Sequence, residues 1–453
     1  MIEDKLDRIR WEITSTCNLN CKHCFIGDKL NNVDNISFAE GKKIVDKLHK
    51  LGCNKISFTA MEPLLFPKIE KLIEYCSQKN IITELVSNGT LLADINRASA
   101  VVHSGLSALY ISMEGIKAET NDYIRGKGTF EKIMQALDNI KKIQMESKLV
   151  HIGIQMTINK MNYSSAKDIA AFFNSLPIDS LHIGGLSLDG NLEGNSDLMI
   201  SSDTFTNSWN IIMKEYLALQ SKNFNLVPKS MLPYESIYYN LFWGTDFKPI
   251  PPRCGILNKS YSLLSDAKLV PCIALLDKGF VDKIPVGSLL KEEMTFEPMY
   301  SFSKEIKSFI NSKKGEDCLN CEFNNSCYPC PVTINQKDAA KTLFERCHTY
   351  KDKIDNLFDD LALNPDYFLV SLKNNVMMKE SNRSIFLKKH YMNYDSYSNR
   401  FKMNKMAVHI MKDLYEKGSL NLSDLKGSNL EAINIFLRKL VINNLINVRK
   451  TVS

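Results

Sequence analysis

The sequence predicts an α/β protein built on a partial (β/α)6 barrel of the TIM type, and three observations support this fold class. Strand-like and helix-like segments alternate between residues 8 and 190. The strand-like segments are short apolar or β-branched runs, as strands buried on both faces are. Candidate ligand-binding residues directly follow these runs, as expected if they lie at the carboxyl ends of parallel barrel strands. Six units instead of eight indicate an incomplete barrel.

Six segments are predicted to form the strands. In chain order they are RIRWEIT (8–14), NKISFTA (54–60), ITELVSNG (82–89), ALYISMEG (108–115), VHIGIQMTI (150–158) and SLHIGGLSL (180–188). Helical patterns lie between them, for example over residues 39–52, which close on a glycine, and over residues 129–144. Because ligands bind at the carboxyl ends of such strands, we expect the site in the loops that follow them.

The composition of the chain excludes several classes of protein. Its 453 residues are 44% hydrophobic and 24% charged, the balance of a globular rather than a disordered or fibrous protein. The first residues, MIEDKLDRIR, carry charges where a secretory signal is apolar, and no apolar run approaches the roughly 18 residues of a membrane span. We therefore expect a cytoplasmic protein with no membrane partner. Twelve cysteines in that reducing compartment indicate metal or redox chemistry.

Two further domains are predicted after a barrel domain of residues 1–232. Residues 233–372 contain Pro- and Cys-bearing loops with weak periodicity, which indicates a small domain held by metal. Residues 373–453 hold 15 Lys and Arg against 6 Asp and Glu, a net charge of +9, which leaves −3 for the rest of the chain. The catalytic body is therefore expected to be near neutral or acidic and the tail strongly basic.

The basic tail has the pattern of a small winged-helix-like domain. Four apolar residues share one helical face: Met403, Met406, Ile410 and Leu414. Gly418 can end that helix, and Ser428 with Glu431 forms a capping box for a second helix. A strand-like run over residues 445–450 follows.

Ten of the twelve cysteines fall into three groups. The groups are Cys17, Cys21 and Cys24; Cys254 and Cys272; and Cys318, Cys321, Cys327 and Cys330 with Cys347 after them. Cys53 and Cys76 stand apart and are expected to be buried thiols. Three thiolates on one loop can hold three irons of a cubane cluster and leave the fourth iron open. A zinc site with His23 as its fourth ligand is the alternative.

The first group resembles the signature of the radical S-adenosylmethionine (SAM) enzymes, C-x3-C-x2-C with an aromatic residue before the last cysteine. Cys17, Cys21, His23 and Cys24 match it. The resemblance implies a [4Fe–4S] cluster whose open iron chelates SAM, and an electron donor such as flavodoxin or ferredoxin. One electron then splits SAM and gives a 5′-deoxyadenosyl radical that abstracts a substrate hydrogen.

The same resemblance implies the residues that hold SAM. The family's Gly-Gly-Glu-Pro motif, which receives the amino group of SAM, is represented by Ala60, Met61, Glu62 and Pro63, without its two glycines. The other matched positions are Ser87 and Asn88 after the third strand, Ser112 for the ribose, Arg125 for the carboxylate, and His23 and Leu186 on the two sides of the adenine.

The remaining cysteines resemble the SPASM extension of these enzymes, which implies two auxiliary [4Fe–4S] clusters and three in all; zinc is the alternative. By this resemblance the outer cluster is held by Cys318, Cys321, Cys327 and Cys347, and the inner cluster by Cys254, Cys272 and Cys330. The chain departs from the family pattern at Ala267, which replaces a glycine, and in the close pair Cys327 and Cys330. Since no further cysteine lies between Cys254 and Cys272, an open inner iron could bind a substrate thiolate.

Three functions were weighed against these residues. The first is a peptide-modifying radical oxidoreductase that acts on a ribosomally made precursor and forms a thioether, a carbon–carbon crosslink or an epimer; its basic tail would bind an acidic leader peptide as an added strand. The second is an anaerobic sulfatase-maturing enzyme, whose general base follows the VPC cysteine. Here Ile273 is at that position, and Asp277 lies farther along the loop. A DNA-binding metal sensor ranks last, because a nucleic-acid partner would leave the radical loop without a role.

Overall fold

The computed structural model divides the chain into two compact units, which are described separately. The first comprises residues 1–230, 254–311 and 331–333, and the second residues 231–253, 312–330 and 334–453. The described residues are 6–27, 33–145, 148–187, 189–193, 197–229, 231–247, 252–276, 284–291, 296–336, 339–363, 368–372, 376–381, 384–391, 394–402, 405–425, 430–443 and 445–450. In these ranges no helix is both long and apolar enough to span a membrane.

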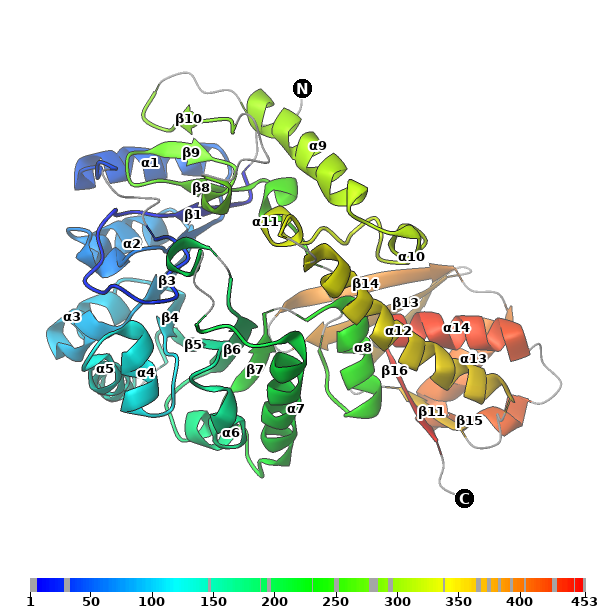
Figure 1. The fold of residues 1–453 in the computed structure, drawn as a ribbon. Coiled ribbons are helices and arrows are strands. Elements are labelled where there is room, and N and C mark those ends of the chain that lie inside the picture. The colour runs from blue at the N-terminus through cyan, green and yellow to red at the C-terminus, as the bar shows by residue number, and fades with distance from the viewer. Residues whose placement is uncertain are drawn as a thin grey trace. The chain divides into compact units, whose positions relative to one another are not determined.

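A ten-stranded sheet organises the first unit (Figure 1), in the order β10-β9-β8-β1-β2-β3-β4-β5-β6-β7. The six predicted strands are β1 (Arg8–Trp11), β2 (Lys55–Phe58), β3 (Ile82–Ser87), β4 (Ala108–Ser112), β5 (His151–Ile158) and β6 (Ser180–Gly185). Each pairs in parallel with the next, which confirms the parallel α/β fold.

Four strands that the sequence reading did not include extend this sheet. They are β7 (Asn225–Pro228), β8 (Ser260–Leu263), β9 (Lys268–Val270) and β10 (Gly287–Ser288). β7 pairs in parallel with β6 and β8 in parallel with β1, whereas β9 and β10 are antiparallel additions. These strands lie beyond residues 8–190, the segment in which strand-like and helix-like runs alternate regularly.

Helices cover the outer face of the curved sheet (Figure 1). They are α1 (Phe38–Lys50), α2 (Ile69–Gln78), α3 (Ile95–Val102), α4 (Ala118–Arg125), α5 (Thr129–Ile143), α6 (Ala166–Asn174) and α7 (Ser202–Ala218), with α9 (Glu297–Ser312) and α11 (Pro331–Ile334) later in the chain. Local sequence fixes their ends where caps are present. At α1, Ser37 and Glu40 form a capping box, in which each side chain accepts a hydrogen bond from the backbone of the other.

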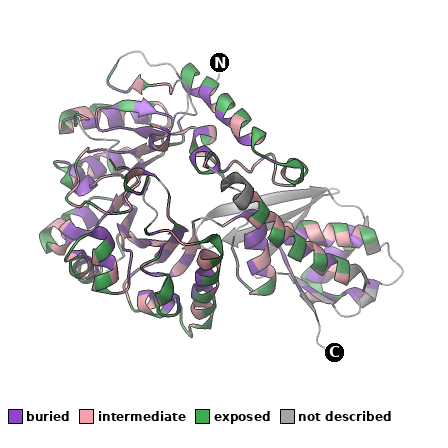
Figure 2. Cartoon of the chain, in the orientation of Figure 1, coloured by how far each residue is buried: buried purple, intermediate pink, exposed green. Residues whose placement is uncertain are grey.

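Side chains along each strand point alternately to the two faces of the sheet, so core residues and site residues alternate in the sequence. Ile9, Trp11 and Ile13 are fully buried on the helix-covered side of β1 and the residues after it. Arg10 and Glu12 have the opposite orientation, because successive residues of a strand point to opposite faces. Figure 2 shows buried residues along the strands and on the sides of the helices that pack against them.

The second unit is formed by helices and two small antiparallel sheets. Its helices are α8 (Pro233–Phe242), α10 (Glu316–Leu319), α12 (Ala339–Leu363), α13 (Lys405–Lys417) and α14 (Leu430–Ile442). One sheet has the order β15-β11-β16, from Ser419–Asn421, Phe368–Leu372 and Ile446–Lys450; the other has the order β12-β13-β14, from Val376–Ser381, Ser384–Tyr391 and Tyr394–Lys402. A single hydrophobic core joins α8, α12, α13 and α14.

The tail contains the helices and the last strand expected from its sequence. Ile410 and Leu414 of α13 are fully buried, and Gly418 follows that helix with a φ of 73°. Glu431 lies in the first turn of α14. The predicted positions Met403 and Ser428 lie outside the described residues. The three-domain division and the winged-helix assignment stay predictions.

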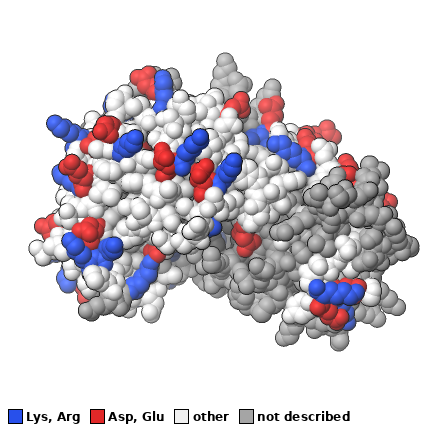
Figure 3. Space-filling view, turned by 90° about the horizontal axis from the view of Figure 1, so that it is seen from below, with Lys and Arg blue, Asp and Glu red and all other residues white. Residues whose placement is uncertain are grey.

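Basic and acidic side chains are interspersed on the described surface seen in Figure 3. Many of them form pairs of opposite sign on the first unit, such as Arg97 with Glu70 and Lys79 with Asp46. Exposed pairs of this kind contribute little to stability, so the fold of this unit depends on its buried strands and helices.

Candidate functional site

The loop after β1 brings Cys17, Cys21 and Cys24 to the carboxyl end of the parallel strands. All three side chains are partly buried. The backbone N–H of Leu19 donates to the Cys17 Sγ at 3.4 Å, and the N–H of Cys24 donates to the Cys21 carbonyl at 3.1 Å. Burial raises the pKa of the Cys21 thiol to about 11. A metal centre at this loop would therefore have to displace protons from its ligands.

A second loop, which the sequence reading did not single out, fixes the cysteine loop from the side of β6. The backbone N–H of Asn191 donates to the Cys24 carbonyl at 2.9 Å, and its side-chain amide donates to the Cys21 carbonyl at 2.8 Å. Gly190 has a φ of 60°, and a Cβ built there would lie 2.2 Å from the Cys24 carbonyl oxygen. The close approach of the two backbones thus requires glycine at this position.

The segment after β2 has backbone angles that favour glycine at two successive positions, although neither residue is glycine. Ala60 and Met61 have φ values of 61° and 46°, in the left-handed region that favours glycine. The next residue, Glu62, is fully buried, and its backbone N–H donates to the Thr16 carbonyl at 3.1 Å. Two non-glycine residues thus hold a backbone conformation at this turn that favours glycine.

Ser87 and Asn88, at the end of β3, connect Glu62 to the cysteine loop. The Ser87 hydroxyl and the Asn88 backbone N–H donate to the two Glu62 carboxylate oxygens at 2.8 and 2.7 Å. The Asn88 amide donates to the Asn18 side-chain oxygen at 2.8 Å and lies 4.0 Å from the Cys17 Sγ. These residues act on the loop through hydrogen bonds, a role that the sequence did not predict.

Glu114 is the centre of a buried polar network at the end of β4. Arg125 donates to one carboxylate oxygen at 2.8 Å, and the same oxygen lies 3.1 Å from the His23 Nε2. The other oxygen accepts hydrogen bonds from the backbone and hydroxyl of Thr157, at 2.8 and 2.6 Å. Although burial opposes ionisation, His23 and Arg125 hold the pKa of Glu114 well below its usual range. The sequence reading missed Glu114, which follows Ser112 in the motif SMEG.

Two polar atoms of this network have no partner within the described part of the chain. They are the Nδ1 of His23 and the Nε of Arg125, and both are buried beside the cysteine loop. Buried polar atoms are normally satisfied, so these two fit a polar ligand held at the site. Ser112 is partly buried at the end of β4, and Leu186 packs on a small apolar cluster of Ile124, Leu192 and Leu198.

Cys254 and Cys272 lie in the first unit and are both partly buried. The residue after Cys272, Ile273, donates its backbone N–H to the Ser262 hydroxyl at 3.2 Å, and that hydroxyl donates to Glu12 at 3.4 Å. Cys330 is exposed and belongs to the second unit. The predicted grouping of these three cysteines joins residues of both units and stays a prediction. Asp277 lies outside the described residues.

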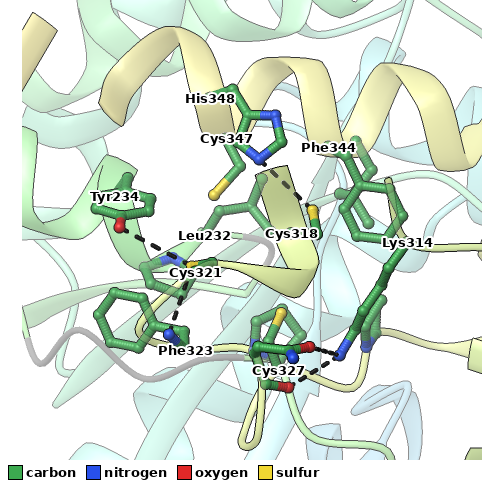
Figure 4. Close-up of a pocket in the computed structure, with 15 residues that line it drawn as sticks. Leu232, Tyr234, Lys314, Cys318, Cys321, Phe323, Cys327, Phe344, Cys347 and His348 are labelled. Carbon is green, nitrogen blue, oxygen red and sulfur yellow. Dashed lines mark hydrogen bonds between the residues drawn. The ribbon is translucent and has the colours of Figure 1, made fainter. Parts of the chain in front are cut away.

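The other four cysteines line one pocket of the second unit (Figure 4): Cys318, Cys321, Cys327 and Cys347. The pocket wall is otherwise mainly apolar, with Leu232, Phe323 and Phe344 among its residues. Burial raises the pKa of both Cys318 and Cys327 to about 11. Across the described ranges, no three His, Cys, Asp or Glu side chains are grouped so as to hold a single metal ion.

Comparisons with known proteins place part of the chain in a sequence family. Residues 11–173 match the radical SAM superfamily. Fe-coproporphyrin III synthase of Methanosarcina barkeri is 34% identical over 176 residues, 38% of this chain and 42% of the synthase. Mycofactocin maturase MftC of Mycolicibacterium smegmatis is 25% identical over 163 residues, 36% of this chain and 40% of the maturase. The chain thus spans less than half the length of these two curated relatives.

A solved structure extends the likeness in fold beyond this segment. Streptococcus suis SuiB bound to its precursor peptide SuiA superposes with a TM-score of 0.58 at 16% identity, over 74% of each chain. At this level of identity the likeness concerns the fold alone.

Proposed function

The chain carries a radical SAM domain, and we propose that it cleaves SAM reductively and uses the radical to modify a ribosomally made precursor peptide. The observation that carries the proposal is the group of three thiols beside two buried nitrogens, on His23 and Arg125, that have no partner among the described residues. Soft thiolates suit an iron–sulfur cluster, and the guanidinium suits a carboxylate. When bound, such a cluster supplies the electron that splits SAM.

The surrounding residues have distinct proposed roles in holding SAM. Arg125 binds its carboxylate, and Glu114 keeps the guanidinium charged and oriented. Ala60 and Met61 present backbone carbonyls to its amino group, because their left-handed conformation matches that of the missing glycines. Ser112 binds the ribose, and His23 and Leu186 lie against the two sides of the adenine.

We propose that the pocket with Cys318, Cys321, Cys327 and Cys347 holds an auxiliary [4Fe–4S] cluster of a SPASM-type domain. Four thiols on an apolar wall support this, since thiolates are the usual ligands of such clusters. Cys254, Cys272 and Cys330 remain candidates for further cluster thiolates. The loaded protein is then expected to contain about twelve irons.

The basic tail is proposed to recognise the substrate as a winged-helix-like domain. The sheet β15-β11-β16 with α13 and α14, in which only the central strand β11 precedes residue 373, is a compact element of the kind that can accept an added peptide strand. Its net charge of +9 over residues 373–453 favours an acidic leader. SuiB, which has a similar fold, binds a precursor peptide; the same substrate class is proposed for this chain.

The bond formed is proposed to be a thioether between a cysteine sulfur and a carbon of the peptide. Carbon–carbon crosslinking and epimerisation are the alternatives within the same class. Tetrapyrrole chemistry is a second candidate function, because the 34% identical relative is an Fe-coproporphyrin III synthase.

Co-expression with a small peptide encoded beside this gene tests the proposal. A loss of about two daltons per bond, with 5′-deoxyadenosine formed, is expected for a crosslink. No mass change with deuterium uptake from solvent would instead identify epimerisation. If the peptide is unaltered but Fe-coproporphyrin III is formed, the peptide assignment is wrong. Raising the salt concentration should weaken peptide binding while SAM cleavage continues, because salt screens the attraction between the basic tail and an acidic leader; binding that does not depend on salt would exclude this charge-based recognition.

A further inference from the structure

Two basic side chains are among the described residues that line the four-cysteine pocket (Figure 4). They are His348, on α12, and Lys314, before α10. No sequence motif singled them out. Both groups can polarise or attract a thiolate, so they bear on the electronic properties of whatever the cysteines hold.

His348 lies directly against one of the predicted ligands. Its Nε2 is 3.5 Å from the Cys318 Sγ, and its Nδ1 is 3.9 Å from the Asp317 carboxylate. A metal-bound thiolate can only accept a hydrogen bond, so the Nε2 must carry the hydrogen in that contact. His348 thereby becomes an N–H···S donor to Cys318.

Lys314 places a positive charge at the opposite side of the same pocket. It is 8% exposed, and its ammonium donates to the backbone and side-chain oxygens of Asn324, each at 2.9 Å. The ammonium also lies 4.8 Å above the Tyr328 ring. These contacts hold the charge in place, where it attracts the Cys318 and Cys327 thiolates.

We propose that His348 and Lys314 are positioning residues that raise the reduction potential of the cluster held by Cys318, Cys321, Cys327 and Cys347. This inference rests on the proposed function for the presence of that cluster. Reduction adds negative charge to a cluster, and an N–H donor and a nearby cation stabilise the more negative state. Because the pocket wall is mainly apolar, solvent screens these two groups little.

The test is a redox titration of the full-length, anaerobically reconstituted protein, monitored by electron paramagnetic resonance. The background carries Cys17→Ala, Cys21→Ala and Cys24→Ala, so that the barrel cluster gives no signal. His348→Phe and Lys314→Met should each move one midpoint to a more negative value, by on the order of the 59 mV that equals a tenfold change for one electron. Lys314→Arg keeps the charge and should retain the parent midpoint. Phe344→Leu, in the apolar wall, controls for repacking.

Three other outcomes are possible, and each would overturn a stated part of the proposal. Unchanged midpoints in both variants, at full iron content, would overturn the tuning role while the cluster assignment stands. Loss of iron from His348→Phe but not from Phe344→Leu would make His348 a group that retains the cluster, which also contradicts the proposal. If Cys318→Ala with Cys321→Ala leaves iron content and spectra unchanged, no cluster occupies the pocket, and the failure lies in the proposed function.

Discussion

Arg125 donates a hydrogen bond to Glu114 at 2.8 Å, and both side chains are buried at the carboxyl ends of the barrel strands. The pair leaves the Nε of Arg125 without a partner among the described residues. The guanidinium is charged, held in place by Glu114, and has an N–H group that can still donate a hydrogen bond. Such a group is suited to bind a ligand carboxylate. Four predictions follow from this site and its surroundings.

Glu114→Gln should weaken both the fold and the binding of SAM. The change leaves the buried Arg125 charge without its counterion, and breaking a buried pair in this way costs about 3–5 kcal/mol. Urea unfolding and equilibrium binding of SAM measure the two effects. Glu119→Gln, on the exposed surface of α4, is the matched control and should change neither. Wild-type SAM affinity in the Glu114 variant would contradict the role given to this residue.

Ala60→Gly should stabilise the protein. A residue with a Cβ in the left-handed region costs roughly 1–2 kcal/mol, and glycine removes that cost at the expense of a more flexible unfolded chain. We expect a net gain of about 0.5–1 kcal/mol, measured by denaturant unfolding. Ala100→Gly in α3 has helical backbone and should instead lose about 1 kcal/mol. A loss of stability at residue 60 like that at residue 100 would show that no strain is stored there.

Gly190→Ala should disturb the cysteine loop. The new Cβ would lie 2.2 Å from the Cys24 carbonyl oxygen, so one of the two backbones must move. We expect less iron bound at this loop and less 5′-deoxyadenosine formed. Gly128→Ala is a stringent control, because Gly128 also has a positive φ but nothing lies within 4 Å of its added Cβ. Equal effects of the two changes would assign the result to backbone strain alone.

Glu12 should make the stability of the protein depend on pH. Burial raises its pKa to about 7, against about 4.5 in the unfolded chain. Since the folded protein binds this proton more tightly, the contribution of Glu12 to stability is greatest below about pH 4.5 and is lost as the pH rises through about 7. The full change is about 3 kcal/mol at about 1.4 kcal/mol per pKa unit.

The measurement for Glu12 compares cluster-free wild type with Glu12→Gln in urea at about pH 5 and about pH 8. The variant lacks the titrating group, so its advantage over wild type should grow toward the higher pH. A constant difference between the two proteins would show that Glu12 has an ordinary pKa.

Much of the barrel could be predicted because its strands are buried and short. The six apolar runs became β1 to β6 in parallel order, since each has a pattern that only burial on both faces explains. The strands β7 to β10 were missed because they lie beyond residues 8–190, outside the regular alternation of strand-like and helix-like runs. The cysteine loop was found because the spacing of its ligands is itself a local sequence feature.

The remaining parts of the site depend on contacts between segments far apart in the chain. Glu114 gains its role only because folding places His23 and Arg125 on the same carboxylate oxygen. Glycine is required at position 190 because its backbone lies against that of Cys24, a contact that no local sequence pattern indicates. His348 becomes a partner of Cys318 because the start of α12 passes the pocket.

The sequence by itself determined the α/β class, the three-cysteine loop and the concentration of positive charge in the tail, because periodicity, cysteine spacing and charge are properties of the chain. Only the tertiary structure decided which groups surround those cysteines. It holds Ala60 and Met61 in a left-handed conformation, because the buried Glu62 fixes the chain there through its hydrogen bonds. It also gathered four thiols, an imidazole and an ammonium around one pocket, since packing, not sequence spacing, sets the distances between them.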